Sequence, residues 1–218
     1  MAPRKKDKAK TAARKHKRAG KDVLRELYKL CPEAGGEAGV KENGKEMFIC
    51  SPKVFSLPES IGTLDGLQIL NLSECPQLLE LPESIGELKA LTVLDLERCT
   101  SLNSLPDSIG GMSALTSLDL TACTSLVALP ATISGLGALT TLNLPACSTL
   151  TALPDARGGL GALSERDLRE CASLVALPDA IGGLKALTEL YLTDCSSLTA
   201  RPGARRGRKE RTTRCVPG

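Results

Sequence analysis

The sequence repeats with a fixed period from residue 58 onward. One unit reads LPxxIGxLxxLxxLxLxxCxxLxx, and successive units follow 24 residues apart, as from Pro58 to Pro82, without an insertion or a deletion. The proline of the unit recurs at Pro58, Pro82, Pro106, Pro130, Pro154, Pro178 and Pro202. The cysteine recurs at Cys75, Cys99, Cys123, Cys147, Cys171 and Cys195. A short, constant period of this kind predicts stacked repeats, in which each unit covers the apolar face of its neighbour.

The pattern inside one unit predicts one strand and one tight turn. In LTVLDLERC, Leu94 and Leu96 alternate with acidic residues, which is the period of a strand that turns its leucines inward. In LPESIGEL, Pro82 suits the first position of a helical turn and Gly86 suits its end. We therefore expect an α/β solenoid: a leucine-rich-repeat horseshoe with a parallel β-sheet on the concave face and short helical or 3-10 turns on the convex face.

The charge is divided unevenly along the chain. Residues 1–21 hold ten Lys and Arg against one acid, and residues 201–218 hold seven against one, which leaves 11 bases and 23 acids between them. Basic arms on an acidic body differ from a uniformly basic protein. We expect four segments: a disordered basic tail (1–21), an N-terminal cap made of a short helix and a hairpin (22–53), six full repeats (54–200) and a second disordered basic tail (201–218).

Two local signals predict the N-terminal cap. KDVLRELYKL favours a short helix, and Asn43-Gly44 favours a hairpin turn. Extending the repeat frame backward places Phe48 one period before Leu72, but it also places Glu46 in an apolar slot. At the other end, the apolar slots of the frame are occupied by Arg205, Arg208, Arg211 and Arg214. We expect the repeats to stop near residue 200, because such a segment has lost its apolar content.

The fifth unit, LPDARGGLGALSERDLREC, carries two arginines where the other units carry apolar residues. Arg157 replaces the isoleucine and Arg166 replaces an inward leucine. An unpaired buried charge costs several kcal/mol, so we expect Arg166 to snorkel outward and to loosen its strand.

The N-terminal sequence argues for an intracellular protein. It is charged from Arg4 onward without an apolar run behind it, so it does not resemble a secretory signal. No segment approaches the roughly 20 apolar residues that span a bilayer, and we expect no membrane association. The nine cysteines are odd in number and do not follow the spacing of a secreted disulfide framework. We expect a location in the cytoplasm or the nucleus.

The sequence offers no set of residues for catalysis, a cofactor or a metal. Cysteines one unit apart in a stacked sheet are too widely spaced for a disulfide bond and do not form a tetrahedral zinc set, so we expect a ladder of reduced, buried thiols. GVKENGK matches part of a phosphate-binding loop, but Glu46 stands where a Ser or Thr would bind magnesium. His16 lies in the basic tail, where we expect it to be solvated. We therefore expect a protein that is not an enzyme and has no cofactor.

The strand residues that flank the inward leucines form the candidate binding surface. They are predominantly polar or acidic, so this concave face should attract a protein partner with a basic segment. The protein's own basic tails are candidates for the same contact, because a flexible tether gives them a high effective concentration. The predicted partner-binding residues are Asn71, Val93, Asp95, Glu97, Asp119, Asn143, Glu165, Asp167, Glu189 and Tyr191.

The unit LPxxIGxLxxLxxLxLxxCxxL, with cysteine where many leucine-rich repeats carry asparagine, resembles the repeat domains of plant intracellular immune receptors of the TIR, nucleotide-binding and leucine-rich-repeat type. It is also similar to plant or algal Ras-group leucine-rich-repeat proteins. The resemblance implies recognition of protein partners in defence or other intracellular signalling. This chain carries no nucleotide-binding module. Two alternatives stay open: a nuclear or nucleic-acid-associated accessory protein that acts through its basic tails, and a degenerate fragment of a larger receptor.

Overall fold

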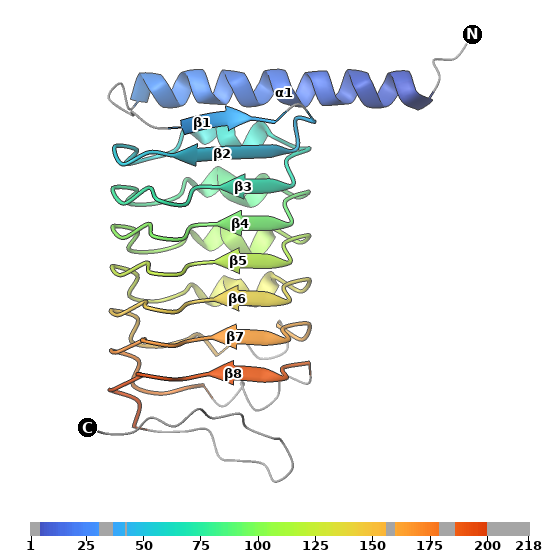
Figure 1. The fold of residues 1–218 in the computed structure, drawn as a ribbon. Coiled ribbons are helices and arrows are strands. Elements are labelled where there is room, and N and C mark those ends of the chain that lie inside the picture. Colours follow the sequence, from blue (N-terminus) through green and yellow to red (C-terminus); the bar gives the residue numbers. More distant parts are fainter. Residues whose placement is uncertain (1–4, 31–36, 42, 156–159, 179–185, 200–218) are drawn as a thin grey trace.

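The computed structural model describes residues 5–30, 37–41, 43–155, 160–178 and 186–199. In this part the chain winds into a solenoid whose strands form one sheet in chain order (Figure 1). The first two strands pair antiparallel, and all later neighbours pair in parallel. The strands are β1 (Glu37–Val40), β2 (Glu46–Cys50), β3 (Ile69–Asn71), β4 (Val93–Asp95), β5 (Ser117–Asp119), β6 (Thr141–Asn143), β7 (Glu165–Asp167) and β8 (Glu189–Tyr191).

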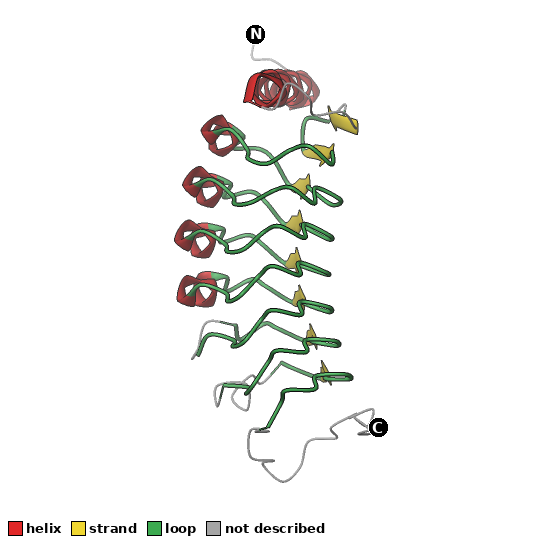
Figure 2. Ribbon diagram, turned by 90° about the vertical axis from the view of Figure 1, so that its left-hand side faces the viewer, coloured by secondary structure: helices red, strands yellow, loops and turns green. Residues whose placement is uncertain are grey.

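Each turn of the solenoid, called a rung below, has a strand on one side and a tight turn on the other. The sheet lines the concave side, and 3-10 helices lie on the convex side (Figure 2). These helices are η1 (Glu59–Thr63), η2 (Glu83–Glu87), η3 (Asp107–Gly111) and η4 (Ala131–Gly135). The predicted parallel sheet with short 3-10 turns is confirmed.

Inward leucines on successive strands lie in register and form the core. Leu94 of β4 pairs with Leu70 of β3 and with Leu118 of β5, and none of the three has exposed surface. Fully burying a leucine side chain contributes about 1.5–3 kcal/mol relative to leaving it exposed. A rung alone would leave this face open to water, so stacking supplies the stability.

Proline and glycine shape the convex turn. Pro82 precedes η2 with φ −67° and ψ 152°, the extended conformation that starts the turn. A Cβ on Gly86 would lie 2.3 Å from the Ser108 carbonyl oxygen in the next rung, so only glycine allows this approach. Lys89 Nζ donates to the Gly86 carbonyl at 2.7 Å and to the Gly111 carbonyl at 3.0 Å. This lysine therefore ties two neighbouring turns together.

The basic N-terminal segment is largely helical, which corrects the prediction of a disordered tail at residues 1–21. Helix α1 spans Lys5–Leu30 and lies across the end of the solenoid (Figure 1). Val23 and Leu27 are buried in the core beneath it. Ala, Lys and Arg favour helix, and the apolar residues near the C-terminal end of α1 anchor it to the solenoid. The sequence reasoning treated these two stretches separately, although they form one helix.

Two small contacts hold the middle of α1 against the rungs. The His16 imidazole lies over Gly66, where a Cβ would be only 2.2 Å from the ring, and His16 Nε2 is 3.3 Å from Asp65 Oδ1. A Cβ on Gly20 would lie 2.6 Å from Val40 Cγ2. The prediction of a solvated His16 is therefore wrong. Because α1 is packed at the end of the solenoid, residues 10–30 do not lie over the concave face of their own chain.

Strand β2 joins the sheet one residue away from the predicted frame. Met47 pairs with Leu70, and both Met47 and Ile49 are buried, whereas Phe48 is only half-buried. Glu46 is thereby moved out of the core, and its carboxylate pairs with Lys41 Nζ at 2.5 Å. The prediction that Phe48 follows the repeat frame is wrong, because a shift of one residue exchanges the two faces of a strand.

Arg166 stays in the core, which corrects the prediction that it snorkels outward. It lies in register between Leu142 and Leu190 and is 3% exposed. Its Nε atom is buried without a hydrogen-bond partner. Burial lowers the pKa of Arg166 to about 10, so it remains a cation at neutral pH. The backbone of β7 is held on both sides by parallel ladders, and this keeps the side chain inward. Arg157 and the predicted tail 201–218 lie outside the described residues.

Candidate functional site

Asparagine or aspartate ends each of the strands β3 to β7. Asp95 Oδ1 accepts a hydrogen bond from the Glu97 backbone N–H at 3.0 Å, and Asp119 Oδ1 accepts one from the Thr121 N–H at 2.9 Å. Asn71 and Asp167 make the same bond to the residue two positions on. Asn143 differs because Pro145 has no N–H. This Asx turn ends the strand, a structural role that the sequence reasoning missed.

The centre of the concave face carries two adjacent carboxylates. Asp95 and Asp119 are partners in the register of β4 and β5. Asn71 Nδ2 donates to Asp95 Oδ2 at 3.0 Å, and Asn143 Nδ2 donates to Asp119 Oδ2 at 2.9 Å. Partial burial raises the pKa of Asp95, the Glu97 N–H bond lowers it, and repulsion from Asp119 raises it again. No cation of the described residues pairs with either carboxylate.

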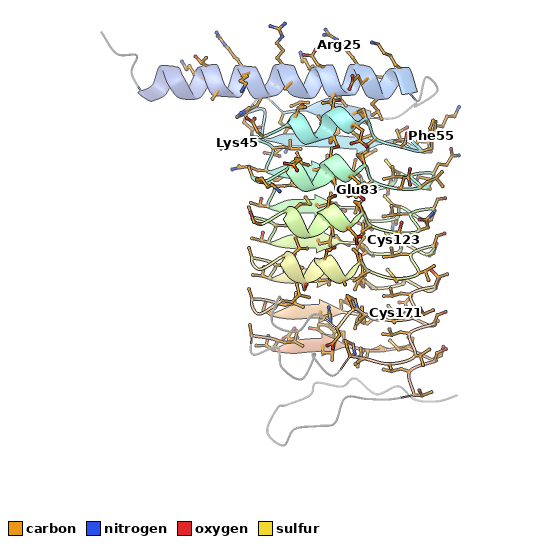
Figure 3. The ribbon with its side chains drawn as sticks, turned by 180° about the vertical axis from the view of Figure 1, so that it is seen from behind. Arg25, Lys45, Phe55, Glu83, Cys123 and Cys171 are labelled. Atoms are coloured by element: carbon orange, nitrogen blue, oxygen red, sulfur yellow. The ribbon has the colours of Figure 1, made fainter. Side chains whose placement is uncertain are left out.

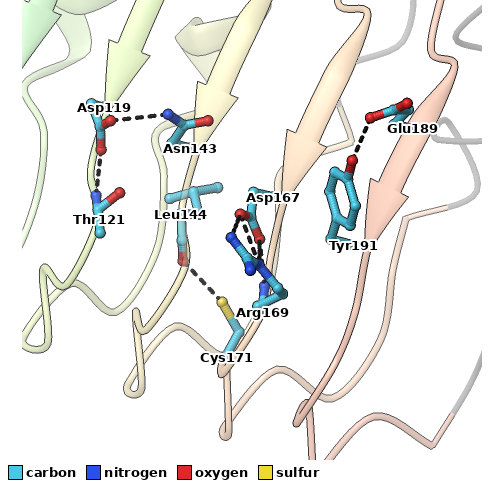
Figure 4. A network of polar contacts seen from close by, with 9 residues as sticks. All are labelled: Asp119, Thr121, Asn143, Leu144, Asp167, Arg169, Cys171, Glu189 and Tyr191. Carbon is cyan, nitrogen blue, oxygen red and sulfur yellow. Dashed lines mark hydrogen bonds and ion pairs between the residues drawn. The ribbon is translucent and has the colours of Figure 1, made fainter. Parts of the chain in front are cut away.

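In the C-terminal half of the concave face, the acidic side chains bind neighbouring side chains of the same chain (Figure 4). Two nitrogens of Arg169 donate hydrogen bonds to the Asp167 carboxylate. Nε lies 3.0 Å from both carboxylate oxygens, and Nη2 lies 2.6 Å from Oδ2. The Arg169 guanidinium also lies 5.8 Å from the centre of the Tyr191 ring. The Tyr191 hydroxyl donates to Glu189. Asp167 is only 8% exposed, so little of its charge reaches a partner.

Two acids in the loops after β3 and β4 also pair with a cation. Arg98 Nη1 lies 2.8 Å from Glu74 Oε1, and Arg98 Nε lies 3.6 Å from Glu97 Oε1. The predicted acidic surface is therefore narrower than the sequence implied, and its uncompensated part centres on Asp95 and Asp119. The remaining predicted residues begin their strands, and they are Val93, Glu165 and Glu189.

The ladder cysteines make the same hydrogen bond in every rung. The Cys99 thiol donates to the Leu72 carbonyl at an S–O distance of 3.2 Å. The Cys171 thiol donates to the Leu144 carbonyl at 3.1 Å (Figure 4). All six ladder cysteines are buried, and none of them forms a disulfide bond in the described residues. Burial raises the pKa of Cys99 to about 12, from an ordinary value of 9.0. These thiols satisfy carbonyl groups and are not nucleophiles at neutral pH.

Comparison with known proteins agrees with the geometry. The model of a leucine-rich repeat region matches residues 47–127. The described residues have the fold of a leucine-rich-repeat solenoid. No curated protein matches the sequence.

Three solved structures are similar to this leucine-rich-repeat solenoid. A leucine-rich-repeat protein of Leptospira interrogans is 28% identical, over 65% of this chain and 41% of that one, with a TM-score of 0.47. The leucine-rich repeat domain of the type III effector XopL is 18% identical, over 93% and 92%, with a TM-score of 0.46. The plant peptide hormone receptor RGFR1, in complex with RGF2, is 28% identical, over 66% and 33%, with a TM-score of 0.37. The chain thus spans less than half the length of the first and third of these proteins.

The leucine-rich-repeat solenoid has a second repeated feature beside each thiol. The residue before each ladder cysteine adopts left-handed backbone, although none of the six is glycine. These residues, with φ between 58° and 60°, are Glu74, Arg98, Ala122, Ala146, Glu170 and Asp194. Such a conformation is uncommon for residues with a Cβ. The left-handed residue and the thiol bond recur in the loops after β3 to β8, and an Asx turn accompanies them after β3, β4, β5 and β7.

In the described ranges, His, Cys, Asp and Glu nowhere form a group of three that could hold a metal ion. None of the helices in that part of the chain has the length and apolar character needed to cross a bilayer.

Proposed function

We propose that this chain is a non-enzymatic protein-interaction scaffold that binds a basic segment of a partner protein on its concave face. Leucine-rich-repeat proteins are commonly interaction scaffolds, and their curved sheets offer an extended surface. The observation that carries the proposal is the pair Asp95 and Asp119. Two half-buried carboxylates on adjacent strands repel one another and have no cation among the described residues. A lysine or arginine placed between them would offset this repulsion.

The ends of the face differ from its centre. Phe48 stands in register with Asn71 at the N-terminal end, and Tyr191 stands in register with Asp167 at the C-terminal end. Both aromatic side chains are half-buried. A partner segment that runs along the solenoid would thus meet aromatic surface at each end and carboxylates between them, which favours a basic segment with apolar flanks.

Binding of a fluorescent peptide of alternating lysine and alanine, ten residues long, tests the proposal. The full chain should bind it at low salt, and the double variant Asp95→Asn/Asp119→Asn should bind it at least about fivefold more weakly, as for loss of a 1 kcal/mol contact. Asn71 makes the Asx turn at the equivalent position of β3, so an asparagine can keep this turn. The matched control is Asp107→Asn/Glu87→Gln, which removes the same charge from exposed sites on the convex turns.

Two results would overturn this proposal. One is peptide binding that the control variant weakens as much as the concave variant, because the effect would then come from net charge alone. The other is an absence of binding at 20 mM salt. A melting curve for each variant shows that the fold is retained. The chain's own basic residues 201–218 are a candidate competitor, and an excess of the corresponding synthetic peptide should displace the probe.

The cellular setting is part of the proposal. We propose an intracellular location, which is supported by six buried ladder cysteines that form no disulfide bond in the described residues. The resemblance of the repeat unit to plant immune receptors supports a role in defence or related signalling.

A further inference from the structure

The outward face of helix α1 carries a continuous row of cations. Successive members are separated by three or four residues, so they lie on one stripe of the helix. They are Lys10, Arg14, Arg18, Lys21, Arg25 and Lys29, and all are exposed. At 1.5 Å per residue, the row is about 28 Å long. We refer to these six residues as the cationic stripe.

The stripe is held rigidly and points away from the solenoid. On the opposite face of α1, Val23, Leu24 and Leu27 are buried in the core, and Gly20 packs against Val40. Arg25 points outward from the end of the molecule (Figure 3). The order of α1 matters, because a folded helix presents its cations at fixed spacing without the entropy cost of ordering a tail.

The acids of α1 do not neutralise the stripe as a whole. Glu26 accepts a hydrogen bond from Ser60 of η1 and is therefore turned toward the solenoid. Asp22 pairs with Arg25 at 2.8 Å. In the described part of the chain, no ion pair involves Arg14 or Arg18.

We propose that the cationic stripe of α1 binds the phosphate backbone of double-stranded nucleic acid. A duplex carries one negative charge per about 1.7 Å of its axis, so a straight row of about 28 Å can meet several phosphates at once. An α-helix with its side chains is about 10–12 Å wide and the major groove of B-DNA about 12 Å, so the exposed half of α1 can lie along the groove edges.

The residue types on the stripe define the mode of binding. Neither Asn nor Gln lies on α1, so two of the usual base-reading side chains are missing. Tyr28 is the single aromatic residue of α1, whereas proteins that bind single strands stack successive bases on several aromatic rings. Contacts to phosphate position a protein without reading sequence. The duplex binding should therefore be independent of sequence.

An anionic membrane is the less favoured ligand for this face. A helix that lies in a bilayer surface inserts an apolar face beside its cations. The apolar face of α1 is already occupied, because Val23, Leu24 and Leu27 pack into the core. The acidic concave face is a separate surface, so the duplex and a basic partner segment can be bound by one molecule.

Fluorescence anisotropy of the full chain with two 24-base-pair DNA duplexes of unrelated sequence tests the proposal between 50 and 200 mM salt. Wild type should bind both duplexes equally, with a steep loss of affinity as salt rises. The variant Arg14→Gln/Arg18→Gln should bind about tenfold more weakly and reduce the slope of log K against log salt by about 2, one for each lost phosphate contact. The matched control Lys53→Gln/Arg98→Gln removes two exposed cations that lie outside α1.

Circular dichroism and melting curves of both variants verify that α1 and the solenoid are intact. Binding that is unaffected by Arg14→Gln/Arg18→Gln would overturn the proposal, as would an equal loss in the control variant. Absence of duplex binding at 50 mM salt would overturn it too. Binding of wild type to vesicles of phosphatidylcholine and phosphatidylserine, 3:1, without duplex binding would assign the stripe to membranes instead.

Discussion

The Cys123 thiol donates a hydrogen bond to the Leu96 carbonyl oxygen, 3.3 Å away in the preceding rung. That carbonyl belongs to the loop after β4, where the chain has left the sheet and has no strand partner. The same bond joins each of the later ladder cysteines to a carbonyl 27 residues earlier, as in Cys195 to Leu168, and the first, Cys75, bonds the Ile49 carbonyl 26 residues earlier. The thiols therefore connect neighbouring rungs of the solenoid by hydrogen bonds.

Cys123→Ala should destabilise the protein by about 1–3 kcal/mol. The substitution removes one of the two donors of the Leu96 carbonyl, which keeps the Cys99 N–H at 3.1 Å, and leaves a small cavity. The midpoint of urea unfolding measures the change. Cys50→Ala is the comparison, because Cys50 is only half-buried and lies outside the ladder; its effect should stay within about 0.5 kcal/mol. Equal effects of the two substitutions would contradict the structural role of the ladder bond.

The ladder thiols should make the protein lose stability at alkaline pH. Burial raises the pKa of Cys75 to about 11 and of Cys99 and Cys147 to about 12, from 9.0. The folded state therefore keeps its thiol protons at a pH where the unfolded chain releases them. The contribution of the protonated thiols to the free energy of unfolding is fully present below about pH 9. It is lost as the pH rises toward 12. Urea midpoints between pH 7 and 11 should fall less steeply for Cys99→Ala than for wild type. Rapid native-state alkylation of Cys99 at pH 8 would also disprove this burial.

Gly86→Ala should destabilise the protein by about 1–3 kcal/mol, because its Cβ would lie 2.3 Å from the Ser108 carbonyl and would push two rungs apart. Gly137→Ala is the matched control. Apart from the glycine and its two chain neighbours, no residue has a heavy atom within 4 Å of a Cβ built at that position. That substitution should be neutral or slightly stabilising, since alanine restricts the unfolded chain more than glycine does. Thermal melting of both variants distinguishes a steric role of Gly86 from a general preference for glycine.

Arg166→Leu should stabilise the protein by about 2 kcal/mol. It replaces a buried cation, whose Nε has no partner, with the residue that the neighbouring strands carry at Leu142 and Leu190. Replacing the exposed Arg98 with leucine should not produce a comparable gain. If Arg166→Leu left the urea midpoint unchanged, the arginine would have to be stabilised by contacts beyond those described.

The period of the sequence was sufficient to predict the rung. Leu94 and Leu96 marked the strand, and Pro82 and Gly86 marked the convex turn, because each of these residues has a local physical preference. The continuous helix α1 could not be predicted in the same way. Its basic half gains support from long-range contacts, such as that of His16 with Gly66, which local patterns do not reveal.

The binding face was predicted as a set of positions but not as a charge distribution. Alternation along each strand put Asp95, Asp119 and Asp167 on the same face. It did not show that Arg169 would neutralise Asp167, since that pair depends on a loop conformation beyond the strand. The Asx turns were missed as well, although an Asn or Asp at each strand end was a signal for them.

From β3 to β8, each strand is joined to the next by the same number of residues, and every pair lies in the same register. Excising or duplicating residues 100–123 would therefore connect backbone positions of equal conformation. Each rung that is added or removed would change the distance between α1 and β8 by about 4.8 Å, the spacing of neighbouring strands. A version with one rung more or one rung fewer would change the separation of the two ends of the molecule by one such step, while both ends keep their structure.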